Sequence, residues 1–273
     1  MRVLMLAQFY VPIIGGEERM VETMAVGLAR RGHDVSVATL SRDDLPPYEE
    51  RDGVRIHRVP SLAQRVQSLF SEGGRRHAMP APDPVTLRAL RRIVRRERPQ
   101  VVHAHNWLVH SIVPLKRWSG AALVLSLHDM SLVCATKRFV RDGAPCTGPG
   151  LRRCVINASR HYGAPKGVPV ALALRRMQPA VHNAVDMFLP VSRAVADGCS
   201  LDARVLPYEV MPNLLDDELY TDAHPESVPT GLPYEAFALF VGDLVEEKGI
   251  DVLLDAYDGL DDPPPLVLIG RPY

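Results

Sequence analysis

Short apolar segments and helical stripes alternate from the first residues of the chain. The runs Val3–Ala7 and Val35–Leu40 have the length and composition of buried strands. Between them, apolar residues recur at the three- and four-residue spacing of an amphipathic helix, and Gly32 supplies its C-terminal stop. The helix stripe consists of Val21, Met24, Ala25 and Leu28. A strand–helix–strand order of this kind implies right-handed crossovers and a parallel sheet.

The same alternation continues further along the chain. More buried strands are predicted at Val54–Val59, Val101–Ala104, Leu123–Leu127 and Met187–Val191. Helices are predicted around Leu87–Val94, Leu108–Trp118 and Ala171–Ala184. Pro179 should kink or split the last of these helices, and Ser192 is placed to cap a further one. The pattern predicts an α/β protein with a Rossmann-like parallel sheet.

A change of composition divides the chain after residue 215. Residues 216–235 are acidic and contain several prolines, which is typical of a linker. A strand, a helix and a strand follow at Phe237–Val241, near Glu247–Leu260 and at Leu266–Ile269. We therefore predict an N-terminal domain over 1–215 and the start of a second Rossmann-like domain over 236–273. The second domain is expected to be incomplete, because about 38 residues cannot bury a doubly wound core.

Composition indicates a globular protein with a sizeable core, since 47% of the residues are hydrophobic and 23% are charged. The 32 basic and 32 acidic residues cancel, which argues against a globally basic nucleic-acid binder. The sequence has no apolar run near the roughly 18 residues of a membrane span, and its opening lacks the layout of a signal peptide. Four cysteines do not make a secreted disulfide framework. We expect a cytoplasmic protein.

Charge is distributed unevenly along the chain. Nine arginines and three acidic residues lie between Arg65 and Arg98, and one lysine accompanies fourteen acidic residues between Asp216 and Asp262. The first stretch could meet an anionic partner, such as a membrane surface or a phosphate-bearing acceptor. The alternative is a solvated helix face next to a solvated linker.

Three predicted strand ends carry residues able to bind a ligand, since open parallel sheets bind ligands beyond the carboxyl ends of their strands. The first is the pair Gly15 and Gly16, ahead of the first helix. Their backbone N–H groups could approach an anion closely at a helix N-terminus, although paired glycines also serve in tight turns. The spacing is neither the dinucleotide-binding pattern nor a P-loop, which disfavours a dehydrogenase or a kinase.

The second strand end holds His128 and Asp129. A histidine there can donate to a substrate hydroxyl, and a neighbouring carboxylate can fix its tautomer; a purely structural histidine is the alternative. His103 and His105, followed by Asn106, end another strand in a similar way. Two histidines at this spacing could suggest a metal, but the strand supplies no further ligands.

The third strand end is in the second domain, where Gly242 and Asp243 precede Lys248. A lysine near a helix N-terminus opposes the helix dipole, so a bound anion would explain its position. A solvated lysine is the alternative. Separately, Cys134, Cys146 and Cys154 lie in a loop rich in glycine and proline, and His161 could complete a set of four zinc ligands. Without a CxxC pair that signal is weak, and free thiols are the alternative; Cys199 stands apart as a core or helix residue.

Several stretches resemble the GT-B glycosyltransferases of family 4, which are retaining enzymes with nucleotide-sugar donors. The resemblance covers Met1–Tyr273 in the family's order, and the ordered set is specific although each stretch is loose. The matching stretches are FYVP with GGEERMVETMAVGLARRGHDVSVAT, then RPQVVHAHN, LSLHD, LPVSRAVAD, VMPNLLDDELY and VGDLVEEKGIDVLLDAY.

This resemblance implies two Rossmann-like domains facing a cleft, with the acceptor bound mainly by the first and the donor by the second. Gly15 and Gly16 would lie near the donor phosphates, His128 would contact the donor sugar, and Lys248 would neutralise the leaving diphosphate. No cofactor or metal is implied, because cations and helix N-termini would stabilise the leaving group. The expected cleft also includes His105, Asn106, Asp129 and Asn213, together with Gly242 and Asp243.

The chain departs from the family pattern in two places. Asp243 stands where the family often has an arginine, a loss for which Arg271 could compensate. The family's pair of glutamates separated by seven residues should lie downstream of residue 273, so we expect a fragment that lacks most of the donor site. The rival interpretation is a non-catalytic Rossmann-like module that binds a glycan or a partner; a nicotinamide-dependent oxidoreductase lacks the glycine spacing.

The expected partners are a nucleotide-sugar donor and a glycan or lipid-linked acceptor, with no nucleic acid. If the acceptor is lipid-linked, the segment Arg88–Arg98 fits a peripheral contact with the inner face of the membrane.

Overall fold

The computed structural model describes residues 1–13, 15–62, 78–215, 232 and 236–270. The chain divides into two compact units, Met1–Leu215 and Asp216–Tyr273, and each is described by itself. The predicted linker 216–235, apart from Leu232, lies outside the described residues, as do Arg271 and the part of the arginine-rich stretch from 63 to 77.

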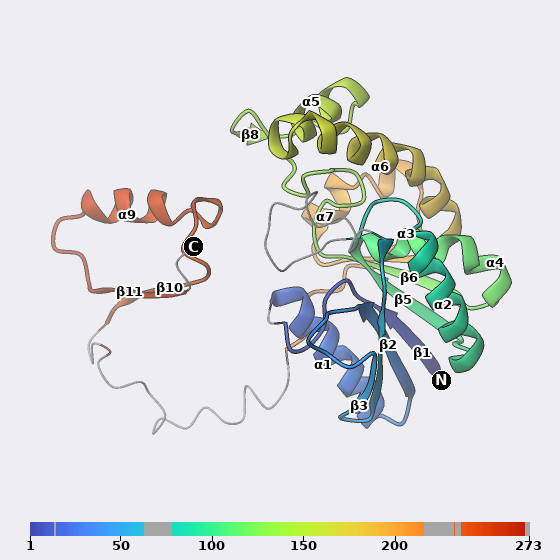
Figure 1. Ribbon diagram of the computed structural model, residues 1–273. Helices are drawn as coiled ribbons and strands as arrows, with labels where there is room; N and C mark the ends of the chain where they lie inside the picture. The colour runs from blue at the N-terminus through green and yellow to red at the C-terminus, as the bar shows by residue number, and fades with distance from the viewer. Residues whose placement is uncertain (14, 63–77, 216–231, 233–235, 271–273) are drawn as a thin grey trace. The chain divides into compact units, whose positions relative to one another are not determined.

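The first unit alternates strands and helices in the order that the hydrophobic pattern predicts (Figure 1). Its strands are β1 (Arg2–Leu6), β2 (Asp34–Leu40), β3 (Tyr48–Arg51), β4 (Val54–Val59), β5 (Val101–His105), β6 (Ala122–Leu127), β7 (Val140–Arg141), β8 (Ala144–Pro145) and β9 (Met187–Pro190). Its α-helices are α1 (Gly16–Arg30), α2 (Pro84–Glu97), α3 (Val109–Ile112), α4 (Lys116–Ser119), α5 (Leu151–Tyr162), α6 (Ala164–Ala184) and α7 (Arg193–Gly198). Short 3₁₀ turns are η3 (Asn106–Leu108), η4 (Val113–Leu115) and η5 (Asp202–Arg204).

Seven strands form one sheet in the order β3-β4-β2-β1-β5-β6-β9. Every described pairing in it is parallel except that of β3 with β4, so the predicted α/β fold with a parallel sheet is confirmed. The antiparallel edge strand β3 was not predicted, because its sequence YEER has no apolar alternation. The strand order reverses between β1 and β5, and in open α/β sheets ligands bind at the carboxyl ends of the strands at such a switch point.

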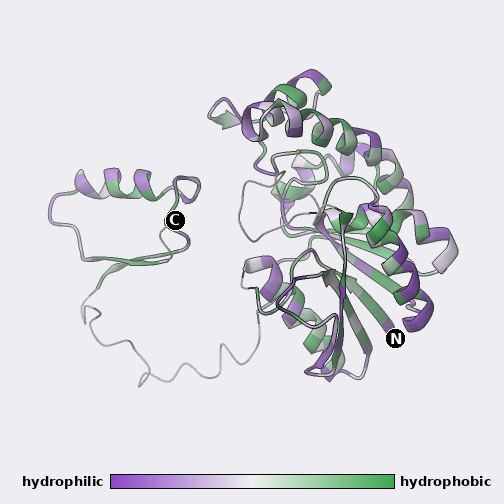
Figure 2. Cartoon of the chain, in the orientation of Figure 1, coloured by the Kyte–Doolittle hydropathy of each residue, from purple (hydrophilic) through white to green (hydrophobic). Residues whose placement is uncertain are grey.

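Helices cover both faces of this sheet, which explains why its central strands are mostly apolar and buried. Val3 and Met5 of β1 belong to one core cluster with α1, whereas Leu4 and Leu6 of the same strand belong to a second cluster with α2 and later helices. Figure 2 shows the same division, with apolar residues on the strands and polar residues on the outer sides of the helices. Of the described helices, none is both long and apolar enough to cross a membrane.

Several helical predictions need correction. The helix expected over Leu108–Trp118 is a succession of short turns, η3, α3, η4 and α4, in which Pro114 falls inside η4. The helix expected from Ala171 begins at Ala164 and continues through Pro169 and Pro179 without a break. It packs against α5, helix on helix. Ser192 caps α7 as predicted, since its hydroxyl accepts a hydrogen bond from Val195 N–H at 3.3 Å.

The described part of the second unit is a small α/β element. The strands β10 (Ala238–Val241) and β11 (Leu266–Ile269) pair in parallel, and between them lie η7 (Glu246–Lys248) and α9 (Ile250–Asp258). At the carboxyl ends of these strands the backbones approach closely: Gly242 N–H donates to the Ile269 carbonyl at 2.9 Å. A Cβ at Gly270 would overlap the Gly242 carbonyl, so only glycine fits there.

Candidate functional site

The loop after β1 leads into α1, whose N-terminus therefore lies at the switch point of the sheet. Gly15 is the N-cap in an extended conformation, with no side chain to cap the helix, and the first N–H groups of a helix have no intrahelical partner. A Cβ at Gly16 would meet no described atom within 4 Å, so packing within the described chain does not require glycine there. Both predicted glycines lie at the N-terminus of α1, but the Glu18 carboxylate already lies against Gly15, where a Cβ would overlap Glu18 Oε2. An anion could reach the helix N–H groups only if this carboxylate moved aside.

Two histidines from neighbouring strands meet at the same edge of the sheet. His105 ends β5 and is fully buried, and His128 directly follows β6. Because β5 and β6 are parallel neighbours with His105 opposite Ser126, the rings of His128 and His105 meet edge to edge, with centroids 5.2 Å apart and planes at 20°. His105 Nδ1 and His128 Nε2 are hydrogen-bonded at 2.9 Å.

The partners of His128 differ from those that the sequence suggested. Asp129 does not bond the ring; its carboxylate accepts from the Ser131 backbone N–H at 2.8 Å. The ring is hydrogen-bonded instead to His105 and to the Asn213 side chain, which brings two predicted cleft residues to it. Burial lowers the pKa of His128, and the Asp129 charge and the Asn213 hydrogen bond only partly oppose that effect.

A polar network around Glu17 lies next to the histidines. Asn106 Nδ2 donates to Glu17 Oε2, and Ser131 Oγ donates to Asn106 Oδ1 at 3.3 Å. Asn106 has a φ of 54°, a left-handed conformation that asparagine tolerates better than most residues. Burial, with repulsion from nearby carboxylates, raises the pKa of Glu17 to about 8. Sequence reasoning singled out Asn106 but missed Glu17, although Glu17 directly follows the paired glycines.

The buried histidines of this edge are neutral at pH 7. His103 stacks on His105 with centroids 4.5 Å apart, and its Nε2 is 2.8 Å from Ser126 Oγ. Burial lowers the pKa of His103 to about 4 and that of His105 well below its ordinary value. The site thus presents neutral hydrogen-bonding groups near the N-terminus of α1, which suits a ligand rich in hydroxyls.

The other predicted binding residues belong to the second unit. Gly242 follows β10 with a φ of 159°, and Asp243 comes next and is exposed. Lys248 ends η7 and is exposed, and Gly249 then adopts the left-handed conformation from which α9 begins. Gly242, Asp243 and Lys248 thus lie on the segment between strand β10 and helix α9, within the second unit.

The cysteine segment is more ordered than its composition suggested. A β7–β8 hairpin and the helix α5 occupy it, and Cys134, Cys146 and Cys154 are free thiols that line one small pocket. Across the described part of the chain, no group of three or more histidine, cysteine or acidic side chains is arranged to hold a metal ion. Cys199 is fully buried, as predicted for a core residue.

A Rossmann-like sheet with a polar site at its switch point, followed by a second α/β unit, defines a protein of the GT-B type. The sucrose-phosphate synthase of Thermosynechococcus elongatus has a similar fold, with a TM-score of 0.59 and 14% identity over 98% of this chain and 70% of that one. The chain belongs to Glycosyltransferase Family 4, which matches residues 14–219. The resemblance drawn from the sequence motifs is confirmed.

Two relatives match parts of the chain at the level of sequence. An uncharacterized glycosyltransferase of Methanocaldococcus jannaschii is 24% identical over 263 residues, which cover 94% of this chain and 59% of that protein. A glycogen synthase of Mycobacterium tuberculosis is 32% identical over 142 residues, 47% of this chain and 33% of that enzyme. The chain therefore spans less than two thirds of the length of these relatives.

Proposed function

We propose that the protein transfers a sugar, of the hexosyl type, from a nucleotide-sugar donor to a glycan or lipid-linked acceptor with retention of configuration. The observation that carries this proposal is the set of contacts at the carboxyl ends of the strands, where Glu17 of α1 bonds Asn106 and His128 bonds His105 and Asn213. Membership of Glycosyltransferase Family 4 supports it.

In this proposal the N-terminus of α1 binds phosphate. The open space at Gly16 lets a ligand approach the backbone N–H groups, and a side chain there would obstruct it. Glu17 lies in the same first turn, where a carboxylate would repel phosphate; its raised pKa keeps the carboxyl largely protonated at pH 7 and removes its share of that repulsion. Glu18 lies against Gly15 in the same turn, and phosphate binding there requires its carboxylate to move away.

His128 contacts the donor sugar in this proposal. A neutral imidazole offers one N–H donor and one acceptor, which suits a sugar hydroxyl better than a charged ring would. His105, Asn106, Asp129 and Asn213 complete the polar surroundings of that ring, as the family resemblance implies.

Lys248 neutralises the leaving nucleoside diphosphate in this proposal. Departure of the diphosphate places negative charge on the leaving group, and preorganised cations and helix N–H groups stabilise such charge. No metal or cofactor is required when protein groups supply that stabilisation. Gly242 and Asp243 line the same strand–loop–helix entry, where Asp243 leaves Lys248 with a larger share of the charge to neutralise.

A peripheral membrane contact through α2 is part of the proposal for a lipid-linked acceptor. Its exposed face carries Arg88, Arg91, Arg92 and Arg95, and Arg91 lies 5.3 Å from the ring centroid of Trp118, which is 46% exposed. Arginines beside an exposed tryptophan favour an anionic lipid surface. Co-sedimentation with vesicles should then require anionic lipid and weaken when Arg88, Arg91 and Arg92 become Gln. The matched control replaces Arg152, Arg153 and Arg160 of α5, and binding that ignores anionic lipid contradicts the contact.

The experiment for the proposed function uses the protein produced from its complete gene. Release of nucleoside diphosphate from a panel of nucleotide-sugars is measured with candidate acceptors, alongside equilibrium binding of the diphosphate. His128→Ala should lower turnover at least tenfold, and Lys248→Ala should weaken diphosphate binding by a similar factor. His33→Ala and Lys166→Ala are the matched controls. Absence of any diphosphate binding contradicts the proposal and favours a non-catalytic module that binds a glycan or a partner.

A further inference from the structure

His105 is the one buried residue of the site whose two ring nitrogens have very different surroundings. Its Nδ1 faces His128 Nε2 at 2.9 Å. Its Nε2 is buried and has no hydrogen-bond partner among the described residues. A buried N–H without an acceptor is strongly disfavoured, whereas a bare nitrogen lone pair is tolerated more readily. The ring therefore carries its single hydrogen on Nδ1.

That assignment determines the hydrogen on His128. With an N–H on His105 Nδ1, the hydrogen bond runs from His105 to His128 Nε2, which must accept through its lone pair. A neutral His128 then carries its hydrogen on Nδ1. The Asn213 hydrogen bond, which favours the protonated ring, agrees with a His128 that donates to the amide oxygen.

Contacts with β5 also fix the plane of the His128 ring. His103 stacks on His105, with centroids 4.5 Å apart and planes at 28°, and His105 meets His128 edge to edge, with centroids 5.2 Å apart and planes at 20°. His103 is in turn held by its contact with Ser126 Oγ at 2.8 Å. Residues of β5 therefore determine both the orientation of the His128 ring and which of its two nitrogens donates a hydrogen bond.

We propose that His105 is a positioning residue, which holds neutral His128 in the tautomer with hydrogen on Nδ1, so that this N–H, directed at the Asn213 amide oxygen, can pass to a bound hydroxyl that displaces that amide. The inference rests on the proposed function for its role in turnover, but the tautomer is a property of the protein without ligand. Its measurement can succeed or fail independently of any sugar transfer.

The test is the long-range ¹H–¹⁵N correlation spectrum of the histidine side chains at pH 7. Wild-type His128 should show a protonated Nδ1 and an unprotonated Nε2, the opposite of the tautomer that free histidine prefers. His105→Asn retains an N–H at about the position of Nδ1 and should preserve this pattern. His105→Leu removes the donor and should move the hydrogen of His128 to Nε2.

The control is His110→Leu, which removes another buried imidazole with an unpartnered nitrogen and should leave the His128 pattern unchanged. In turnover, His105→Leu should lower kcat about tenfold with little change in KM, and His105→Asn should restore most of it. Hydrogen on His128 Nε2 in the wild type overturns the proposal without any variant. An unchanged pattern in folded His105→Leu overturns it equally, whereas correct tautomers without any sugar transfer would count only against the proposed function.

Discussion

At the amino ends of β1, β2 and β4, polar side chains are charged and paired, whereas at the carboxyl ends of β1, β5 and β6 they are mostly neutral. Both groups lie on the same sheet, at opposite ends of its central strands. The comparison between these two edges separates groups that maintain the fold from groups that remain available to a ligand.

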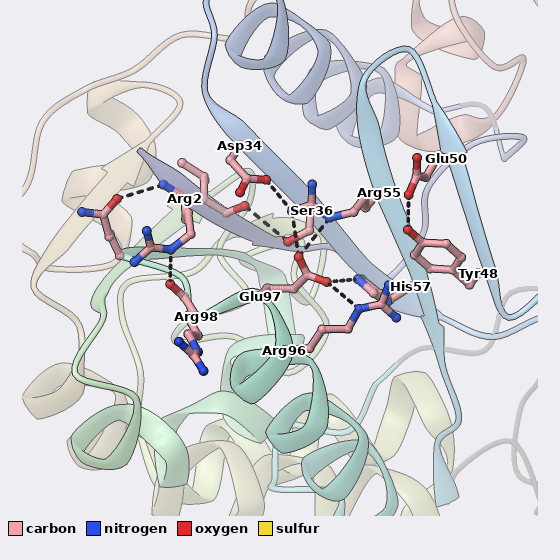
Figure 3. Close-up of polar contacts among 12 residues, drawn as sticks. Arg2, Asp34, Ser36, Tyr48, Glu50, Arg55, His57, Arg96, Glu97 and Arg98 are labelled. Carbon is pink, nitrogen blue, oxygen red and sulfur yellow. Dashed lines mark hydrogen bonds and ion pairs between the residues drawn. The ribbon is translucent and has the colours of Figure 1, made fainter.

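The amino edge is organised around Glu97, at the last turn of α2 (Figure 3). Its buried carboxylate accepts from Arg55 Nε at 3.0 Å and Nη2 at 2.7 Å, and it contacts His57 Nε2 at 3.0 Å. Arg2 Nε donates to the Arg98 carbonyl at 2.7 Å. These contacts use up the hydrogen-bonding capacity of Glu97 and tie β1, β4 and α2 together.

The carboxyl edge contains hydrogen-bonding capacity that the described chain does not use. His105 Nε2 has no partner among the described residues. The first backbone N–H groups of α1 have no acceptor within their own helix. Neutral imidazoles replace ion pairs, which avoids the desolvation of fixed charges. The contrast indicates that ion pairs stabilise the amino edge and that the carboxyl edge is prepared for a ligand.

The largest expected effect is on the amino edge. Glu97→Ala leaves Arg55 and His57 without their shared acceptor, and breaking such a buried pair costs about 3 kcal/mol. Urea unfolding followed by tryptophan fluorescence measures this, because Trp107 and Trp118 both lie in the first unit. The matched control is Glu50→Ala, an exposed glutamate expected to change stability by less than about 0.5 kcal/mol. Equal losses in the two variants would contradict the structural role of Glu97.

The second effect is on the free energy of unfolding at acidic pH. Burial lowers the pKa of His110 to about 4, below the ordinary 6.5, so the unfolded state takes up a proton first as pH falls. Its contribution to stability is complete above pH 6.5 and is lost on approach to pH 4, which amounts to about 2 kcal/mol between pH 7 and pH 5. His110→Leu should make the fall in unfolding free energy over that range smaller by this amount. An unchanged pH dependence would show that His110 is already protonated or exposed.

The third effect is a loss of stability as pH rises, in contrast to the loss at His110 as pH falls. The pKa of Glu17 is raised from 4.5 to about 8, so between these pH values the unfolded state releases a proton that the folded state keeps, and stability is lost progressively as pH rises to 8. Glu17→Gln keeps an oxygen that can accept from Asn106 and cannot ionise. The stability advantage of the variant over the wild type should grow by about 1 kcal/mol between pH 7 and pH 9. An advantage that does not grow between pH 7 and pH 9 would contradict the raised pKa.

The smallest effect tests the rim of the amino edge. Asp34 pairs with Arg55 at 2.5 Å, but its side chain is 47% exposed. Asp34→Asn should therefore cost only about 0.5 kcal/mol, much less than Glu97→Ala. If the two substitutions lower the free energy of unfolding by similar amounts, the more buried contact of this edge is not the more stabilising one, which contradicts the account.

The hydrophobic pattern predicted the fold well where burial determines the sequence. The runs at Val3–Ala7 and Leu123–Leu127 are strands because both of their faces are covered. It failed where local signals are weak or misleading: β3 is a polar edge strand, and α6 continues through two prolines.

The site was predicted residue by residue but not as a set of contacts. His105 and His128 were each identified as strand-end residues, yet their hydrogen bond depends on β5 and β6 being neighbours in register, which is a long-range property. Assuming that adjacent strands follow in chain order would have paired them. The raised pKa of Glu17 depends on burial and on carboxylates distant in sequence, which no local pattern reveals.

The central claim is that the carboxyl edge of the sheet receives the nucleotide-sugar. The most direct measurement is a ¹H–¹⁵N chemical-shift titration of the protein from its complete gene with uridine-, guanosine- and adenosine-linked sugars. For one of them, the backbone amides of Gly16 and Asn106 and the His128 ring should shift with a common affinity, while the amides of Arg55 and Glu97 stay in place. Saturable shifts confined to the amino edge, with none at Gly16 or His128, would contradict the account.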